Sequence, residues 1–233
     1  MIQQAVKFME YGFIFDMDGV VIDSNPNHKI AWSKFLKGKG IPCDDQFFDE
    51  VLSGRTGPTS LKIIFGEDLP ETLLEEYLAE VDENYQNILL ESEEARPIAG
   101  LYEFLDSIRR NGHRLALATS APPLNITLGL EKLNLEGVFE VILGKVDVVH
   151  GKPHPEVYLT AVQRLGLPRE KCIVFEDSKA GIQSARSAGI PVVGIASGHT
   201  REELLHEGVA LAVEDFRELD LKQVCSLIKN GRI

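Results

Sequence analysis

An apolar run ends abruptly in two acids at Phe13-Ile14-Phe15-Asp16-Met17-Asp18-Gly19. A short apolar run of this kind is typical of a buried β-strand. Ligands of open parallel sheets bind beyond the carboxyl ends of the strands, so acids at this place are positioned for chemistry. Because Asp16 and Asp18 repel each other, either one is protonated or a hard cation such as Mg²⁺ lies between them. The alternative is a pair of solvated loop acids.

Strands and helices alternate in the part of the chain that follows Pro97. Short aliphatic or β-branched runs are separated there by segments of helical period, which predicts an α/β fold with a parallel sheet covered by helices. Besides residues 13–15, the predicted strands are Leu115–Ala118, Val141–Leu143, Cys172–Phe175, Val192–Ile195 and Leu211–Val213. Gly112, Gly166 and Gly189 follow helical segments, where a left-handed residue commonly ends a helix.

Residues 26–96 have a different pattern, with helical periodicity and no convincing strand. Trp32, Phe35 and Leu36 form one apolar stripe, and a longer stripe lies on an acidic segment at Leu73, Leu74, Tyr77, Leu78, Val81, Tyr85 and Ile88. We therefore predict two units, an α/β core of residues 1–25 and 97–233 and an inserted α-helical cap of residues 26–96. Pockets favour such interfaces, so we expect the substrate between the two units.

Three further strand or loop ends carry polar groups, namely Glu176-Asp177, Thr119-Ser120 and Lys152 in Gly151-Lys152-Pro153-His154-Pro155. Each has a simple structural alternative: a helix cap, a Ser/Thr turn and a solvent-facing lysine. Taken with Asp16 and Asp18, however, they supply acids, a hydroxyl and a cation from separate strand or loop ends. That combination suits a phosphate ester, because a lysine and Mg²⁺ offset the charge of the phosphoryl oxygens while a carboxylate attacks phosphorus.

These motifs resemble, in the same order, those of the haloacid dehalogenase superfamily of phosphotransferases. The matching residues are Asp16-x-Asp18-Gly-Val-x-x-Asp23-Ser24, Thr119, Lys152-Pro-x-Pro and Glu176-Asp177-Ser-x-x-Gly-Ile. The chain is most similar to the branch with a helical cap after the first strand, which includes β-phosphoglucomutase-like proteins and sugar phosphatases. The resemblance implies a Rossmann-like core with a parallel sheet flanked by helices, an inserted cap and a Mg²⁺ cofactor.

The resemblance also implies roles for individual residues. Asp16 is implied to be the nucleophile that forms an aspartyl-phosphate, and Asp18 the general acid and base. Mg²⁺ would be held by the carboxylates of Asp16 and Asp177 and the backbone carbonyl of Asp18, with Glu176 beside it or in contact through water. The phosphate oxygens would be bound by Thr119, Lys152 and the backbone N–H groups of Met17, Asp18 and Ser120.

The predicted cap bears on the choice between a phosphatase and a phosphomutase. Asn27-His28-x-x-x-Trp32 resembles the mutase pattern, in which the histidine contacts the general acid; the alternative for His28 is a surface residue at the start of a helix. In Ser53-Gly54-Arg55-Thr56-Gly57-Pro58 the two cations with which mutases grip a second phosphate are absent from their matching positions, and only Arg55 is nearby.

We therefore expect a Mg²⁺-dependent phosphatase of small phosphorylated metabolites, either sugar or polyol phosphates, with a phosphomutase as the alternative. A third hypothesis, a related protein that binds a metabolite without turnover, does not account for the complete set of acids. Two histidines outside the motifs, His113 and His206, are interpreted as surface residues.

Composition limits the remaining possibilities. With 24 Lys and Arg against 36 Asp and Glu, the formal net charge is −12, which argues against a nucleic acid or an anionic membrane as partner. No apolar stretch approaches the roughly 20 residues that span a bilayer. The cysteines Cys43, Cys172 and Cys225 are scattered and odd in number, which suits a reducing compartment. We expect a soluble, cytoplasmic monomer whose partner is a small-molecule phosphate ester.

Overall fold

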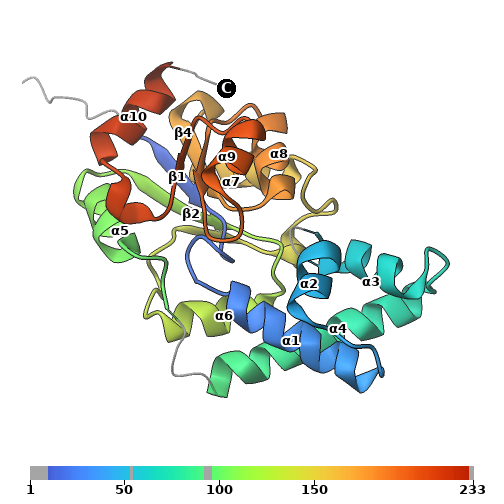
Figure 1. Ribbon diagram of the computed structural model, residues 1–233. Coiled ribbons are helices and arrows are strands. Elements are labelled where there is room, and N and C mark those ends of the chain that lie inside the picture. Colours follow the sequence, from blue (N-terminus) through green and yellow to red (C-terminus); the bar gives the residue numbers. More distant parts are fainter. Residues whose placement is uncertain (1–9, 53–54, 92–95, 231–233) are drawn as a thin grey trace, which may run out of the picture.

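The protein is built around one sheet of six parallel strands in the order β3-β2-β1-β4-β5-β6. The computed structural model describes residues 10–52, 55–91 and 96–230 (Figure 1). The strands are β1 (Gly12–Phe15), β2 (Arg114–Ala118), β3 (Val141–Leu143), β4 (Cys172–Glu176), β5 (Val192–Ile195) and β6 (Leu211–Val213). All six predicted strands are confirmed, and the α/β class with them. The chain winds outward from β1 in one direction and then from β4 in the other, so a topological switch point lies between β1 and β4.

The helices divide between the sheet and the segment inserted after β1. The inserted segment contains α1 (Asn25–Gly38), α2 (Asp45–Phe47), the π-helical turn η1 (Phe48–Leu52), α3 (Gly57–Phe65) and α4 (Glu71–Glu91). The helices around the sheet are α5 (Leu101–Arg110), α6 (Pro123–Lys132), α7 (Glu156–Leu165), α8 (Lys179–Ser187), α9 (Arg201–His206) and α10 (Leu221–Asn230). Short 3-10 turns lie at η2 (Lys145–Asp147), η3 (Arg169–Lys171) and η4 (Phe216–Glu218).

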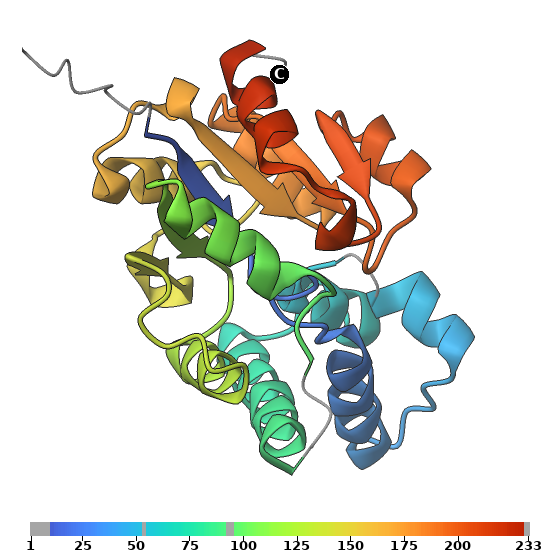
Figure 2. The same cartoon turned by 90° about the vertical axis from the view of Figure 1, so that its left-hand side faces the viewer.

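The sheet is covered on both faces, which explains why its strands are almost continuously apolar. Alternate side chains of β1 point to opposite faces, so Phe13 and Phe15 join one hydrophobic cluster and Ile14 joins another. The first cluster includes residues of α5, α6 and α10, and the second includes residues of α7, α8 and α9 (Figure 1 and Figure 2). Phe15 stacks on Phe175 of the neighbouring β4, with ring centroids 4.5 Å apart, so the central strands are locked in register where the acids follow.

The inserted helices pack around a hydrophobic cluster of their own. It contains Phe35 of α1, Leu61 of α3 and Val81 of α4, and α1 lies along α4. The helix α1 ends at Gly38, and Gly40 just beyond it has φ +74°. One prediction here is wrong: Leu73 is exposed, because on a helical period its neighbour Leu74 takes the inward position.

His113 also departs from the prediction that it lies at the surface. Its ring stacks on Phe13 with the centroids 5.4 Å apart and leans against Tyr11 at 5.3 Å. Burial lowers the pKa of His113 and outweighs the opposite effect of Glu10. His206, in contrast, is exposed on α9 as expected.

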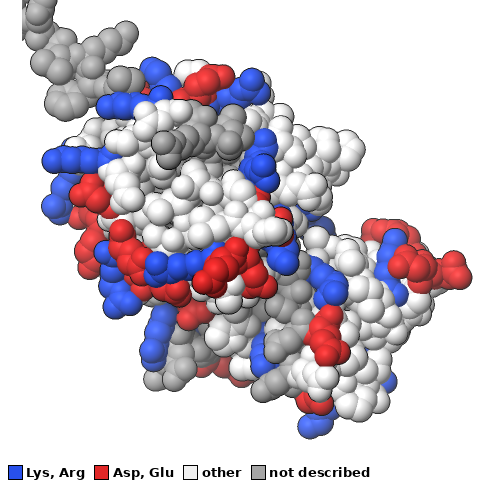
Figure 3. All heavy atoms as spheres, turned by 45° about the horizontal axis from the view of Figure 1, so that its top comes forward, with Lys and Arg blue, Asp and Glu red and all other residues white. Residues whose placement is uncertain are grey.

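The surface shows no segregation of charge on the face drawn in Figure 3, where Lys and Arg side chains lie next to Asp and Glu. Over residues 10–52, 55–91 and 96–230, no helix combines the length and the apolar character that crossing a membrane requires.

Candidate active site

The loop after β1 turns back tightly at the carboxyl edge of the sheet. Sheet pairing ends at Asp16, whose N–H donates to the carbonyl of Phe175 at 3.0 Å. The carbonyl of Met17 then accepts the N–H groups of Val21 and Ile22 at 2.9 and 3.0 Å. Gly19 lies in this turn with φ +71°, and a Cβ there would be 2.0 Å from Oδ2 of Asp177. The turn therefore needs glycine for both its backbone and its space, and it brings the first acidic motif against the last.

Three of the predicted acids meet at this edge. One carboxylate oxygen from each of Asp16, Glu176 and Asp177 lies within 4.8 Å of the other two, and the three residues are buried. They converge because β1 and β4 are neighbours and Phe15 is in register with Phe175. The alternative of a solvated loop acid does not describe Asp16, which is buried. The helix cap offered as the alternative for the last motif is supplied by Ser178, whose hydroxyl accepts the N–H of Gly181 at 3.1 Å at the start of α8.

Lys152 is buried among these acids. Its Nζ donates to Oδ1 of Asp16 at 2.6 Å, to Oε1 of Glu176 at 2.7 Å and to the carbonyl of Ala118 at 3.1 Å. Its side chain is only 6% exposed, so the alternative of a solvent-facing lysine is wrong. Burial lowers the pKa of Lys152, but the charges of Asp16 and Glu176 outweigh it and raise the pKa well above its ordinary value, so the ammonium keeps its charge.

Glu176 is fully buried, and its two oxygens are saturated with hydrogen bonds. Besides Lys152, Oε1 accepts the hydroxyl of Tyr158 at 2.8 Å. Oε2 accepts the N–H groups of Asp177 and Ser178 and the Ser178 hydroxyl, at 3.0, 2.9 and 3.0 Å. Glu176 therefore holds Lys152 in place, and it also lies within the acid cluster, as a position beside the metal requires.

The acid cluster carries more negative charge than Lys152 offsets. Burial, followed by the charge of Glu176, raises the pKa of Asp177 well above its ordinary value. Burial also raises the pKa of Asp16 to about 7, although Lys152 lowers it. Oδ2 of Asp16 and Oδ1 of Asp177 accept no hydrogen bond from the described residues. Free oxygen donors with excess buried negative charge fit a hard divalent cation such as Mg²⁺.

Asp18 is partly exposed, and its carboxylate contacts His28 of α1 and Ser24, the N-cap of that helix. Its Oδ1 accepts the Ser24 hydroxyl at 2.7 Å and contacts Nε2 of His28 at 3.1 Å. The His28 ring is stacked on Tyr85 of α4, with centroids 4.2 Å apart and an interplanar angle of 9°. Burial raises the pKa of Asp18, but His28 and Ser24 more than offset it and lower the pKa. The contact favours a site role for His28 over that of a plain surface residue.

The residues expected to bind phosphate oxygens lie where β1 and β2 end. Thr119 is buried, and its N–H donates to the carbonyl of Leu143 at 3.0 Å. Its hydroxyl is therefore the remaining donor for a phosphate oxygen. That hydroxyl already accepts the N–H of Ala121 at 3.1 Å. Ser120 follows at an exposed position. Among the described residues, the N–H groups of Met17, Asp18 and Ser120 have no acceptor, as an anion site requires.

Arg55 contacts the backbone of the inserted helices instead of the acids. Its Nη1 donates to the carbonyl of Glu50 at 2.6 Å, and its side chain is exposed. Ser53 and Gly54, at one of the positions where mutases carry a cation, lie outside the described residues.

Two further residues that were not predicted from the sequence, Tyr158 and Ser197, contact the acids. The hydroxyl of Ser197 donates to Oδ2 of Asp177 at 3.1 Å. Ser197 follows β5, so the same strand-end pattern that revealed Asp177 could have revealed it.

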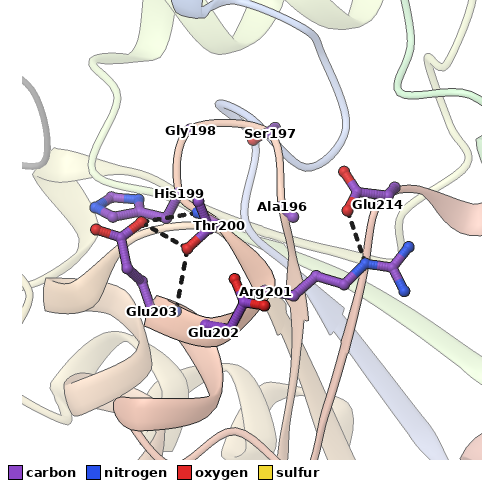
Figure 4. A pocket seen from close by; sticks show the side chains of 9 residues that line it. All are labelled: Ala196, Ser197, Gly198, His199, Thr200, Arg201, Glu202, Glu203 and Glu214. Atoms are coloured by element: carbon purple, nitrogen blue, oxygen red, sulfur yellow. Dashed lines mark hydrogen bonds and ion pairs between the residues drawn. The ribbon is translucent and has the colours of Figure 1, made fainter.

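Ser197 also lines a cavity of about 490 Å³ with residues 198–203 and Glu214 (Figure 4). Arg201 in that cavity is paired with Glu214 and Glu218 at 2.7 and 2.5 Å, so its charge is already satisfied.

Comparisons with known proteins agree with this geometry. The chain is 33% identical over 207 residues to a phosphorylated carbohydrates phosphatase of Thermotoga maritima, covering 88% of this chain and 94% of that protein. It is 31% identical over 186 residues to the fructose-1-phosphate phosphatase YqaB of Escherichia coli, covering 79% and 95%. The crystal structure of a HAD hydrolase of family IA, variant 3, from Entamoeba histolytica matches with a TM-score of 0.88 and 31% identity, covering 95% of this chain and 100% of that one. The family model of haloacid dehalogenase-like hydrolases matches residues 13–195, and the chain belongs to this family.

Proposed function

We propose that this hydrolase is a Mg²⁺-dependent phosphatase of small phosphorylated metabolites, in particular sugar or polyol phosphates. The observation that carries the proposal is the position of Asp16, whose carboxylate lies 2.6 Å from Nζ of Lys152 and within 4.8 Å of Asp177. The names of two relatives, a phosphorylated carbohydrates phosphatase and a fructose-1-phosphate phosphatase, support the class of substrate.

The binding step follows from the charges at the sheet edge. Mg²⁺ would be held by the carboxylates of Asp16 and Asp177 and the backbone carbonyl of Asp18, and when bound it supplies positive charge to the phosphoryl oxygens. Lys152 supplies a second positive charge. The hydroxyl of Thr119 and the free N–H groups of Met17, Asp18 and Ser120 orient the remaining oxygens.

The chemical steps are assigned to the two aspartates of the first motif. A carboxylate oxygen of Asp16 attacks phosphorus, the bond from phosphorus to the ester oxygen breaks, and Asp18, in its protonated form, donates a proton to the departing alkoxide. Asp18 then takes a proton from a water that attacks the aspartyl-phosphate, which releases inorganic phosphate and restores Asp16. Most of the roughly 20 kcal/mol by which such enzymes lower the barrier comes from charge placement and in-line positioning.

The inserted helices are proposed to act as the cap, with residues 26–96 covering a core of residues 1–25 and 97–233. Several contacts join these units, and two of them illustrate the connection. His28 of α1 contacts Asp18, and Nε2 of Gln86 on α4 donates to Oδ1 of Asn125 on α6 at 2.8 Å. The position of the cap therefore determines whether the general acid is held in place.

A phosphomutase is the second candidate, and the contact of His28 with Asp18 favours it. A mutase must also bind a phosphate at the far end of its bisphosphate intermediate. Within the described residues of the cap, Arg55 is committed to the carbonyl of Glu50. We therefore rank the phosphatase first.

Activity against a panel of phosphorylated metabolites tests the proposal. With Mg²⁺, the protein is expected to release one inorganic phosphate per substrate consumed, and Asp16→Asn is expected to abolish the release while leaving the fold intact. Isomerisation of a sugar phosphate that a bisphosphate stimulates would establish the mutase instead. Turnover that survives Asp16→Asn would contradict both candidates.

A further inference from the structure

The loop that carries Lys152 also brings together three donor groups that the proposed reaction does not use. Nδ1 of His150 lies 2.9 Å from Oε2 of Glu156, and Nδ1 of His154 lies 3.8 Å from the same oxygen. The two imidazole rings have centroids 4.5 Å apart. All three donor atoms lie within 4.8 Å of one another, so one ion can reach all of them.

The type of donor differs from that of the acid cluster at Asp16. Two imidazole nitrogens and one carboxylate oxygen suit Zn²⁺ and similar transition metal ions, whereas Mg²⁺ prefers oxygen donors alone. Donors at the usual bond lengths of tetrahedral zinc are about 3.3 Å apart. The separations of 2.9 and 3.8 Å lie on either side of this value, so small side-chain movements would complete the coordination.

The carboxylate of the set is already ionised and fixed in place. The N–H of Val149 donates to Oε1 of Glu156 at 2.8 Å, and the N–H of His150 donates to Oε2 at 3.0 Å. These bonds, first that of Val149 and then those of His150, lower the pKa of Glu156 to about 2. Pro153 and Pro155 restrict the backbone on both sides of His154.

Two hydrogen bonds compete with an ion for the imidazoles. Nδ1 of His150 is bonded to Glu156, and Nδ1 of His154 accepts the N–H of Glu156 at 3.3 Å. The side chains of His150 and His154 are 62% and 50% exposed. Hydrogen bonds of such exposed groups contribute little to stability, so an ion can displace them. The exposure also leaves room for the water that completes a site with three protein ligands.

We propose that His150, His154 and Glu156 form a binding site for a transition metal ion of the Zn²⁺ type, separate from the acid cluster at Asp16. The fragment His150-Gly-Lys-Pro-His154-Pro-Glu156 supplies all three ligands from seven consecutive residues. The ion closes the loop on both sides of Lys152, whose ammonium points inward to Asp16 and Glu176.

Metal binding by the full-length protein without an affinity tag tests the proposal, and Co²⁺ serves as the probe. Excess Mg²⁺ is present to occupy the acid cluster, and the wild type is expected to bind one equivalent of Co²⁺ with the strong visible absorption of a four-coordinate site containing nitrogen donors. Zn²⁺ is expected to displace the Co²⁺ and remove the absorption.

Variants locate the site. His150→Asn and His154→Asn are each expected to weaken Co²⁺ binding at least about 10-fold, and the double variant to eliminate the equivalent. His206→Asn, which replaces an exposed histidine on α9, is the matched control and is expected to bind one equivalent of Co²⁺ like the wild type. The double variant Asp16→Asn/Asp177→Asn is also expected to bind one equivalent of Co²⁺, because the acid cluster is not part of the proposed site.

Three results would overturn the proposal: no equivalent of Co²⁺ bound by the wild type in excess Mg²⁺, unchanged binding in the double histidine variant, or loss of binding in Asp16→Asn/Asp177→Asn. Glu156→Gln provides a second route if the histidine variants do not fold, because glutamine keeps the size of the side chain and one oxygen that can accept the N–H of Val149 or of His150, but loses the charge that the ion needs. Unweakened binding by Glu156→Gln would equally contradict the site.

Discussion

At the scale of single residues, Lys152 links Asp16, the proposed nucleophile, to the rest of the site. Its ammonium contacts two buried carboxylates, so its removal leaves their charges without a partner. We expect Lys152→Ala to lower the free energy of unfolding by about 3–5 kcal/mol, the usual cost of breaking a buried ion pair. We expect it to lower kcat/KM by at least about 100-fold as well.

Denaturant unfolding and steady-state kinetics measure these two effects. Lys222→Ala, which removes an exposed lysine of α10, is the matched control and should change stability by no more than about 0.5 kcal/mol. Equal stability and activity of the two variants would show that Lys152 does not have the position described.

We propose that His28 is a positioning residue, which acts on the reaction through its contact with Asp18. His28→Asn is expected to lower kcat about 10- to 100-fold with little change in KM, because the general acid loses its orientation while the phosphate site stays intact. Steady-state kinetics with the preferred substrate provides the test. A rise in KM at unchanged kcat would assign His28 to substrate binding instead.

Cys172 illustrates how burial suppresses reactivity. Burial raises the pKa of its thiol to about 12, and its sulfur would lie 2.8 Å from a Cβ at Gly12. We expect iodoacetamide at pH 8 to modify the partly exposed Cys43 in the native protein and to leave Cys172 unmodified, as measured by peptide mass spectrometry. Equally fast labelling of both cysteines would indicate that β4 is not packed as described.

At the scale of secondary structure elements, the sequence was most informative for the central strands, which are buried on both faces of the sheet. Strands covered on both faces are apolar without interruption, which is why β1 and β4 could be located almost to the residue. The acids that follow them could be predicted because they end such runs. Tyr158 could not, since a tyrosine in the apolar stripe of α7 has the same pattern whether or not its hydroxyl contacts Glu176.

The cap helices make a separate stability test possible. Phe35 of α1 is fully buried among Trp32, Phe65 and Tyr77, whereas Ile30 of the same helix is 54% exposed. We expect Phe35→Ala to lower the free energy of unfolding of the cap by about 3–5 kcal/mol and Ile30→Ala to change it far less. Urea unfolding followed by Trp32 fluorescence measures the difference. A loss in Phe35→Ala no greater than that in Ile30→Ala would contradict the packing of the cap.

At the scale of the whole molecule, His113 makes stability depend on pH. Burial lowers the pKa of this imidazole in the folded protein, while the unfolded chain takes up a proton near the ordinary value of about 6.5. The unfolded state therefore binds more protons below that pH, and the free energy of unfolding falls as the pH is lowered through it.

Denaturant unfolding of the wild type and His113→Gln at pH 7.5 and pH 5 tests this sign. The decrease in stability between the two pH values is expected to be smaller in the variant, which has no imidazole to protonate at this position. A decrease of the same size in both proteins would mean that His113 titrates normally in the folded state.

The assembly of the site is a property of the whole molecule that the sequence indicated only indirectly. The motifs at residues 16, 119, 152 and 176 could be located individually, but only the order β2-β1-β4 places the first, second and fourth side by side. The hydrogen bonds that saturate Glu176, and so tie it to Lys152, depend on side-chain directions that spacing in the sequence does not specify.

The central claim, that Asp16 accepts the phosphoryl group, is tested most directly by trapping the phosphoenzyme. Protein that is turning over a sugar phosphate with Mg²⁺ is quenched in acid, digested and analysed by mass spectrometry. We expect one phosphoryl group on the peptide containing Asp16, at that residue, and none in Asp16→Asn. A phosphoryl group on a different residue of the wild type, or the same adduct in Asp16→Asn, would contradict it.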